Sequence, residues 1–370
     1  MSRTMGRVAA VAVASTAVLV GAASAAWAAK AQTVKVTIND DGCPAKLSIK
    51  AGPTTFKVTN SGSGDVSEFE VLKGDHIIGE VENIAPGLNG EFSLTLKAGT
   101  YTTNCPGGSK HSKGKLIVAG TAATKLDTKQ QAAVDQYRAY LVDQSTQLVA
   151  ATKAFTDAVD AGNVDLAKQL YPTARVFYER IEPVAETFGN LDPEIDARQG
   201  DVPDKQWGGF HKIEQALWVD GSTSGLDPNV TKELDAHVAQ LANLVHDVEL
   251  QPAAIANGAV ELLNEVSSSK ITGEEERYSR TDLVDFEANV QGSQAAFDAV
   301  KPLLAGKNAA LASDIDARFA AVNTALDPYR RGTAFVAYTE LTPDDTKALS
   351  QVIDALAEPL SEVAKQIVSA

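Results

Sequence analysis

Glycine, proline and basic residues are too scarce in this sequence for several classes of protein. The 370 residues include 27 glycines and 14 prolines, too few for a fibrous or low-complexity chain. The 33 lysines and arginines are outnumbered by 48 aspartates and glutamates, which gives a formal net charge of −15. Nucleic-acid binding needs clustered basic residues, so this balance disfavours a nucleic-acid partner. An acidic chain suits a protein that handles cations, although solubility also explains the charge.

Common catalytic and nucleotide-binding motifs are also missing. The sequence has no Gly-x-Ser-x-Gly nucleophile motif, no Walker loop for phosphate and no Gly-x-Gly-x-x-Gly after a predicted strand. What remains is an ordinary globular composition, 44% hydrophobic and 22% charged. The length allows two or three domains, each with a core of its own.

The N-terminus has the pattern of an export signal. Arg3 and Arg7 precede an apolar run over residues 8–20, and small-x-small cleavage sequences follow. We therefore expect residues 1–28 to be a signal peptide and the mature protein to be periplasmic or associated with the cell envelope. No later segment is apolar enough to span a membrane, so the chain is not expected to be a permease itself.

The hydrophobic pattern changes its period once along the chain. Residues 30–119 contain short runs that alternate apolar and polar side chains, separated by glycine and proline turns, which predicts a small β-sandwich. A linker of small residues follows at 120–125. A period of 3.6 then predicts a long helix over 128–160.

The second half, residues 126–370, is predicted to be an antiparallel helix bundle. A second helix is expected over 164–188, with a kink or break at Pro172, followed by a loop over 189–203. No strand is predicted after residue 120. Further helices are expected near 205–218, 229–248, 252–267, 281–301, 308–328 and 343–367.

One pair of residues in the helical half has the spacing of a metal site. His211 and Glu214 are three residues apart, so they share one face of a helix. Helical bundles present first-row metals with imidazole and carboxylate at this spacing. Spacing alone favours an ordinary surface pair. The apolar flanks predict a buried helix instead, where a charge needs a partner or a metal: Trp207, Phe210, Ile213, Leu217 and Trp218.

The sequence around this pair resembles the imelysin-like (M75) family. The signature Gly-x-His-x-x-Glu at 209–214 and the stretches at 178–183, 191–198 and 273–286 carry the resemblance. With a cupredoxin-like N-terminal domain, they resemble extracytoplasmic components of bacterial iron-uptake systems. The resemblance implies that His211 and Glu214 bind iron. It also implies two partners, a membrane iron permease and a secreted haem-containing peroxidase.

Two ligands do not hold iron well, so further ligands must come from other helices. Asp227, in the turn after the motif helix, matches a metal ligand of the family by resemblance. Glu182, Glu275, Asp282 and Asp285 are further candidates. Each of these acids could instead be solvated or could stabilise the first turn of a helix.

Both cysteines lie in the β half, and two interpretations stay open for them. Cys43 and Cys105 would usually form a disulfide in an exported protein. The alternative is a thiolate metal site completed by Glu68 and Glu70, which share one face of a predicted strand. A blue-copper site is disfavoured, because His111 has the wrong spacing and both methionines lie in the signal. The resemblance implies that this domain takes copper or a second iron ion.

Three functions remain open at this point. The signal, the acidic balance and the motif favour a non-enzymatic iron-binding protein that captures iron and passes it to a permease. A metallopeptidase is the alternative, as the M75 family is named, but the His-Glu-x-x-His helix is absent and Gln215 follows Glu214. A periplasmic polysaccharide binder that uses a bridging metal is the third.

Overall fold

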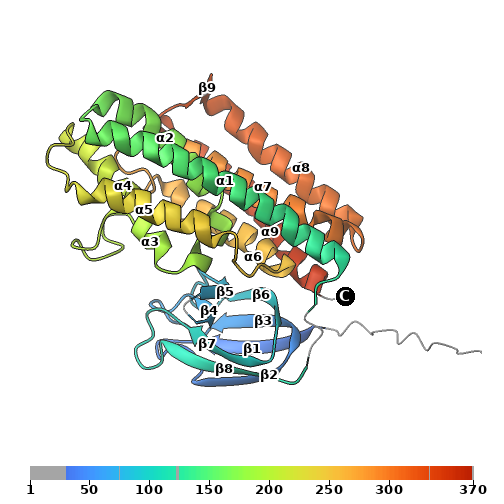
Figure 1. Ribbon diagram of the computed structural model, residues 1–370. Helices are drawn as coiled ribbons and strands as arrows, with labels where there is room; N and C mark the ends of the chain where they lie inside the picture. The colour runs from blue at the N-terminus through green and yellow to red at the C-terminus, as the bar shows by residue number, and fades with distance from the viewer. Residues whose placement is uncertain (1–30, 75, 122–124, 333, 369–370) are drawn as a thin grey trace, which may run out of the picture.

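The computed structural model describes residues 31–368 except 75, 122–124 and 333. The predicted signal peptide, residues 1–28, lies outside the described residues. A β-sandwich is followed by a helical domain, which confirms the predicted fold class. Figure 1 shows the helical domain lying across one side of the sandwich, with β5 (His76–Val81) and β6 (Asn89–Leu96) toward the helices.

The sandwich consists of a three-stranded and a five-stranded sheet, ordered β1-β3-β6 and β2-β8-β7-β4-β5. The β1–β3 and β2–β8 pairs are parallel, and the other pairs are antiparallel. Alternating side chains meet between the sheets, where the Phe56 and Phe92 rings stack with centroids 5.0 Å apart. The strands are β1 Gln32–Ile38, β2 Lys46–Lys50, β3 Gly52–Asn60, β4 Phe69–Lys73, β5 His76–Val81, β6 Asn89–Leu96, β7 Gly99–Asn104 and β8 Lys113–Ala119.

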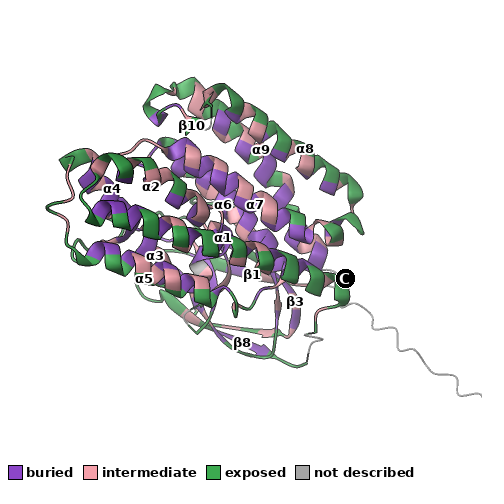
Figure 2. Cartoon of the chain, turned by 45° about the horizontal axis from the view of Figure 1, so that its top comes forward, coloured by how far each residue is buried: buried purple, intermediate pink, exposed green. Residues whose placement is uncertain are grey.

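Most of the long helices bury one face, whereas the central helices α6 and α7 are buried around most of their surface, as the purple regions in Figure 2 show. Helix α1 packs against α2, α5 and α7, and α6 packs against α7 and α9. None of the described helices is long and apolar enough to cross a lipid bilayer. The long helices are α1 Thr128–Asp160, α2 Val164–Glu179, α5 Asn229–Leu244, α6 Pro252–Ser268, α7 Asp282–Ala305, α8 Ala309–Leu326 and α9 Pro343–Val368.

Short elements connect these helices, and several of them differ from the sequence-based expectation. Helix α2 continues through Pro172 without a break, because Tyr171 and Ala174 on either side are anchored in the core. A 3₁₀ segment follows it, and a short helix lies inside the predicted loop. Two two-residue strands also lie beyond residue 120, where none was predicted. The short elements are η1 Glu182–Phe188, α3 Leu191–Asp196, α4 Gly209–Gln215, η2 Ala216–Asp220, η3 Lys270–Thr272, η4 Asp327–Tyr329, β9 Arg330–Arg331, β10 Ala334–Phe335 and η5 Tyr338–Glu340.

Polar contacts join the two domains. Asn257 of α6 donates a hydrogen bond from Nδ2 to the Ser93 carbonyl oxygen at 2.9 Å. Glu249, just before α6, forms ion pairs with Lys73 at 2.7 Å and Lys97 at 2.5 Å. Helix α6 packs on strands β5 and β6, and η1 packs on β5.

Candidate metal centre

The motif helix α4 begins at a backbone crossing that only glycine allows. Gly209 has a φ of +69°, and a Cβ at this position would lie 2.1 Å from the carbonyl oxygen of Ile195. Glycine tolerates both the positive φ and the close approach. The crossing brings Asp196, the last residue of α3, to the ring of His211.

The imidazole of His211 is buried, with carboxyl groups at both of its nitrogen atoms. Nδ1 lies 3.1 Å from Glu214 Oε2, and Nε2 lies 3.5 Å from Asp196 Oδ1 and from Glu275 Oε1. One potential ligand atom from each of Asp196, His211 and Glu275 lies within 4.8 Å of the others. The same holds for His211, Glu214 and Glu276. The ring thus offers two possible metal-binding positions, one at each nitrogen.

Glu214 is held rigidly by the backbone of the segment before α7. Its Oε1 accepts hydrogen bonds from the backbone N–H groups of Tyr278 at 2.9 Å and Ser279 at 2.7 Å. Burial would raise the pKa of Glu214, but the hydrogen bond from His211 and these two amides lower it. Glu214 is therefore an ionised, fixed partner that orients the His211 ring through Nδ1.

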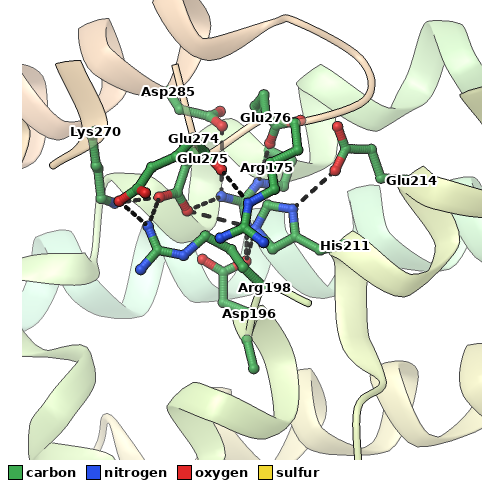
Figure 3. Close-up of polar contacts among 12 residues, drawn as sticks. Arg175, Asp196, Arg198, His211, Glu214, Lys270, Glu274, Glu275, Glu276 and Asp285 are labelled. Atoms are coloured by element: carbon green, nitrogen blue, oxygen red, sulfur yellow. Dashed lines mark hydrogen bonds and ion pairs between the residues drawn. The ribbon is translucent and has the colours of Figure 1, made fainter. Parts of the chain in front are cut away.

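A fully buried arginine lies at the centre of the same cluster (Figure 3). Arg175 of α2 donates from Nε to Glu276 Oε1 at 3.0 Å. Its other guanidinium nitrogens form ion pairs with Glu179, Asp196, Glu275 and Asp285. Two of these carboxylates, Asp196 and Glu275, also face His211, so a metal bound there would share them with Arg175.

A second buried cation, Lys270 of η3, extends the cluster toward η1. Its Nζ lies 3.2 Å from Glu179 Oε2, 2.5 Å from Glu182 Oε1 and 4.0 Å from Glu275 Oε2. Asn289 of α7 donates from Nδ2 to the same two acids, at 2.8 Å to Glu179 Oε2 and 2.5 Å to Glu182 Oε2. Lys270 therefore links Glu182, at the edge of the cluster, to Glu275 beside His211.

The cluster has more acids than its basic side chains can neutralise. Burial and the charge of Glu276 raise the pKa of Asp285 well above its usual value, and burial raises that of Asp282 to about 7. Burial and Arg175 oppose the charged form of His211. The nearby carboxylates of Glu214 and Glu275 outweigh them and raise its pKa to about 9. The site therefore holds protons that an incoming cation would displace.

Several buried polar atoms of the cluster have no hydrogen-bond partner. They include His211 Nε2, Asp282 Oδ2, Asn289 Oδ1 and both carboxylate oxygens of Asp285, of which Oδ2 keeps its ion pair with Arg175. Such atoms are costly in a folded protein unless another group or an ion satisfies them. Oxygen atoms with one imidazole nitrogen form a donor set that suits iron. The chemistry of the cluster thus fits a metal cation.

The structure brings most of the predicted ligands together. His211, Glu214, Glu275, Asp282 and Asp285 line one buried cluster, and Glu182 lies at its edge. Asp227 is exposed, and its Oδ1 accepts a hydrogen bond from the Asn229 backbone at the start of α5. This contact is an Asx turn just before α5, and none of the contacts among the described residues places Asp227 in the cluster.

Sequence reasoning missed Asp196, Glu276, Arg175 and Glu179. All four lie in or near stretches that carry the family resemblance, yet no periodicity or spacing distinguishes them from neighbouring charged residues. Only the tertiary packing of α2, α3 and the 273–281 segment brings them to His211. The Gly209 crossing is the one local signal that could have pointed to Asp196.

The expected thiolate metal site in the β domain is wrong in this structure. Cys43 and Cys105 form a disulfide with a Cα–Cα distance of 5.4 Å, so neither sulfur can act as a thiolate ligand. Glu70 is also engaged, because its two carboxylate oxygens accept hydrogen bonds from Asn104 Nδ2 at 3.0 and 3.1 Å. The structure therefore supports the disulfide interpretation of the two cysteines.

Three acidic residues of the β domain lie close together. Glu68 lies just before β4, while Glu80 and Glu82 lie in and just after β5. One carboxylate oxygen from each lies within 4.8 Å of the others. Of the predicted β-domain ligands, Glu68 alone joins this group.

Comparisons with known proteins agree with the fold. Residues 133–363 match the family model of imelysin, and residues 9–118 match that of a cupredoxin-like domain. The molecule is thus an imelysin protein with an N-terminal cupredoxin-like domain. Iron uptake system component EfeO of Escherichia coli K12 is 42% identical over 359 residues, which cover 94% of this chain and 95% of that protein. EfeO of Shigella flexneri matches equally well. This chain belongs to the EfeO family.

A solved structure shows the same helical fold at low sequence identity. An iron-regulated protein A precursor from Parabacteroides distasonis superposes with a TM-score of 0.50 at 17% identity. The match covers 66% of this chain and 97% of that protein. At this identity the likeness concerns the fold alone.

Proposed function

We propose that this protein is the extracytoplasmic iron-binding component of an iron-uptake system, and that it holds iron in the His211 cluster. The observation that carries the proposal is the buried Nε2 of His211, which has no hydrogen bond and faces Asp196 and Glu275 at 3.5 Å. Its relatives are named as iron uptake components. The captured iron would pass to a membrane permease, with a secreted haem-containing peroxidase as a further partner.

Within this proposal, the ligands are His211 Nε2, Asp196 and Glu275. Glu214 orients the ring instead of binding the metal, because both of its oxygens already have partners. Carboxylates that accept the second imidazole N–H in this way are common around metal-bound histidines. Iron would then take over carboxylates that now pair with Arg175.

A metallopeptidase finds less support in this geometry. Such enzymes bind zinc with two histidines one helical turn apart and keep an open position for water. Among the described residues, His211 is the one histidine in the cluster, and it is 1% exposed. A polypeptide substrate could not reach it without opening the bundle.

The β domain would have at most an oxygen-ligand site. Glu68, Glu80 and Glu82 offer carboxylates alone, and such hard donors suit iron better than copper, which prefers imidazole and thiolate. We therefore favour the second iron ion over copper for this domain.

Calorimetric titration of the full mature chain with Co²⁺, a redox-stable substitute for Fe²⁺, tests the ligand assignment. Replacing His211 by Ala or Asp196 by Asn removes a ligand and should weaken binding at least about 100-fold. Glu214→Gln removes only an orienting partner and should cost about 10- to 100-fold. Asp227→Asn, an equal change of charge at an exposed position, is the matched control. Undiminished binding by the His211 variant would overturn the proposal.

A further inference from the structure

A cavity lies between the two domains and carries carboxylates on both of its sides. Its volume is about 320 Å³. Strand β5 and the residues after it contribute Glu80 and Glu82, and α6 contributes Glu261 and Glu265. Glu182, at the start of η1, also lines the cavity and pairs with the buried Lys270 of the helical domain. The cavity therefore touches both the acidic group of the β domain and the edge of the His211 cluster.

A chain of charged contacts leads from this cavity to His211. Glu182 Oε1 lies 2.5 Å from Lys270 Nζ, and the same ammonium group lies 4.0 Å from Glu275 Oε2. Glu275 Oε1 in turn lies 3.5 Å from His211 Nε2. One buried side chain, Lys270, thus separates the cavity acid Glu182 from the proposed ligand Glu275.

Unsatisfied oxygen atoms occur along this chain of contacts. Asn289 is fully buried, and its Nδ2 contacts Glu182 while its Oδ1 has no hydrogen-bond partner. Asp285, one helical turn earlier on α7, is 1% exposed, and neither of its oxygens has a hydrogen bond. Both side chains offer oxygen ligands to a cation that moves inward from Glu182.

The surface at Arg198 is less suitable for the entry of a cation. There Arg198 covers Glu275, with Nη1 3.0 Å from Glu275 Oε2 and 3.3 Å from Glu274 Oε1. Its side chain is 22% exposed, so a guanidinium group faces any ion that approaches from solvent. A fixed positive charge at this surface repels cations, whereas the cavity attracts them.

We propose that the cavity between the domains is the passage by which a metal cation reaches and leaves the His211 cluster, with Lys270 closing its inner end. This inference rests on the proposed function. The cavity carboxylates hold the cation in transit. The cation then takes the place of the Lys270 ammonium group between Glu182 and Glu179.

Stopped-flow kinetics with Co²⁺ on the full mature chain tests the passage. Quenching of Trp207 and Trp218, which flank α4, reports arrival of the ion. Glu261→Gln with Glu265→Gln removes two cavity charges and should slow binding and release at least about threefold each. The dissociation constant should stay the same within about twofold, because a passage changes rates and leaves the end states alone. The matched control is Asp354→Asn with Glu358→Gln, an exposed pair of equal spacing on α9.

The role of Lys270 is tested by Lys270→Met, which keeps the length of the side chain and removes its charge. Faster binding and faster release support the inference, and unchanged or slower rates contradict it. If the Lys270 variant fails to fold, the rates of the double variant Glu261→Gln with Glu265→Gln remain as the test of the passage. If the double variant Glu261→Gln with Glu265→Gln binds and releases Co²⁺ at the same rates as its control variant, the proposed passage is wrong. That result would leave the proposed iron binding unaffected. Absence of Co²⁺ binding by the unmodified protein would instead overturn the proposed function.

Discussion

Metal binding at His211 should displace protons, and the pKa of this residue sets the size of the effect. The carboxylates around the ring raise its pKa to about 9, so the imidazole is protonated at pH 7. A metal needs the neutral ring. Removing the proton at pH 7 costs about 2.7 kcal/mol, which corresponds to two pH units at 1.36 kcal/mol each.

The expected result is binding that tightens as the pH rises. Between pH 6 and 8 the apparent affinity for Co²⁺ should increase about tenfold per pH unit, because the whole range lies below the pKa of the ring. Titration calorimetry in buffers of different ionisation enthalpy should show release of at least about one proton at pH 7. Asp282, with a pKa of about 7, can add to this number.

A matched control is His237→Ala, because His237 is half-buried outside the cluster, with Nε2 3.5 Å from Glu194. This variant should release as many protons as the unmodified protein. An affinity that stays constant from pH 6 to 8, with no proton release, would refute the reasoning. It would mean that the metal does not bind the imidazole, or that the ring is already neutral before the metal arrives.

Three further predictions concern stability, each measured by urea unfolding of the mature chain. Arg175→Met leaves five carboxyl groups without their shared cation and should lower the free energy of unfolding by about 3–5 kcal/mol. The control Lys301→Met breaks the more exposed ion pair with Asp316 and should cost far less. Gly209→Ala places a Cβ 2.1 Å from the Ile195 carbonyl oxygen at a positive φ and should cost about 2 kcal/mol or more of stability. The control is Gly200→Ala, where φ is also positive but no atom lies within 4 Å, so that its cost measures backbone strain without the clash. Replacing Cys43 and Cys105 by Ser removes a link across 62 residues and should cost about 2–5 kcal/mol, with no free thiol titrating in the denatured, unreduced parent. If the Arg175 or Gly209 variant is as stable as its control, the corresponding structural interpretation is wrong. Two reactive thiols in the unmodified protein would contradict the disulfide.

The period of the sequence predicted the secondary structure well where helices are long. The helix expected over 128–160 is present with those bounds, because its apolar face repeats over many turns and Asp127 caps its first turn. Short or interrupted elements were harder to predict. A break at Pro172 was one expected outcome, but the helix continues through it because packing of the flanking core residues outweighs the loss of one hydrogen bond. Helix α3 is six residues long, too short for a periodic signal.

The candidate site was predictable only in part, for a different reason. His211 and Glu214 share a helix turn, so their proximity follows from spacing alone. Asp196 and Glu276 reach His211 only because α3, α4 and the segment before α7 converge, and a single sequence contains no distance information about that. The two cysteines are 62 positions apart, so the choice between disulfide and thiolate site also depended on tertiary structure.

The buried arginine and lysine give the cluster a property that suits a carrier. Removing carboxylates from water without counter-charges is costly, and many small metal sites fold only when the metal supplies those charges. Here Arg175 and Lys270 supply them from within the chain. Folding of the bundle then need not depend on the cargo, and the cargo competes with an internal cation for the same oxygens. In the proposed function, such competition would weaken binding, and weaker binding would allow a captured ion to be released again to the next protein.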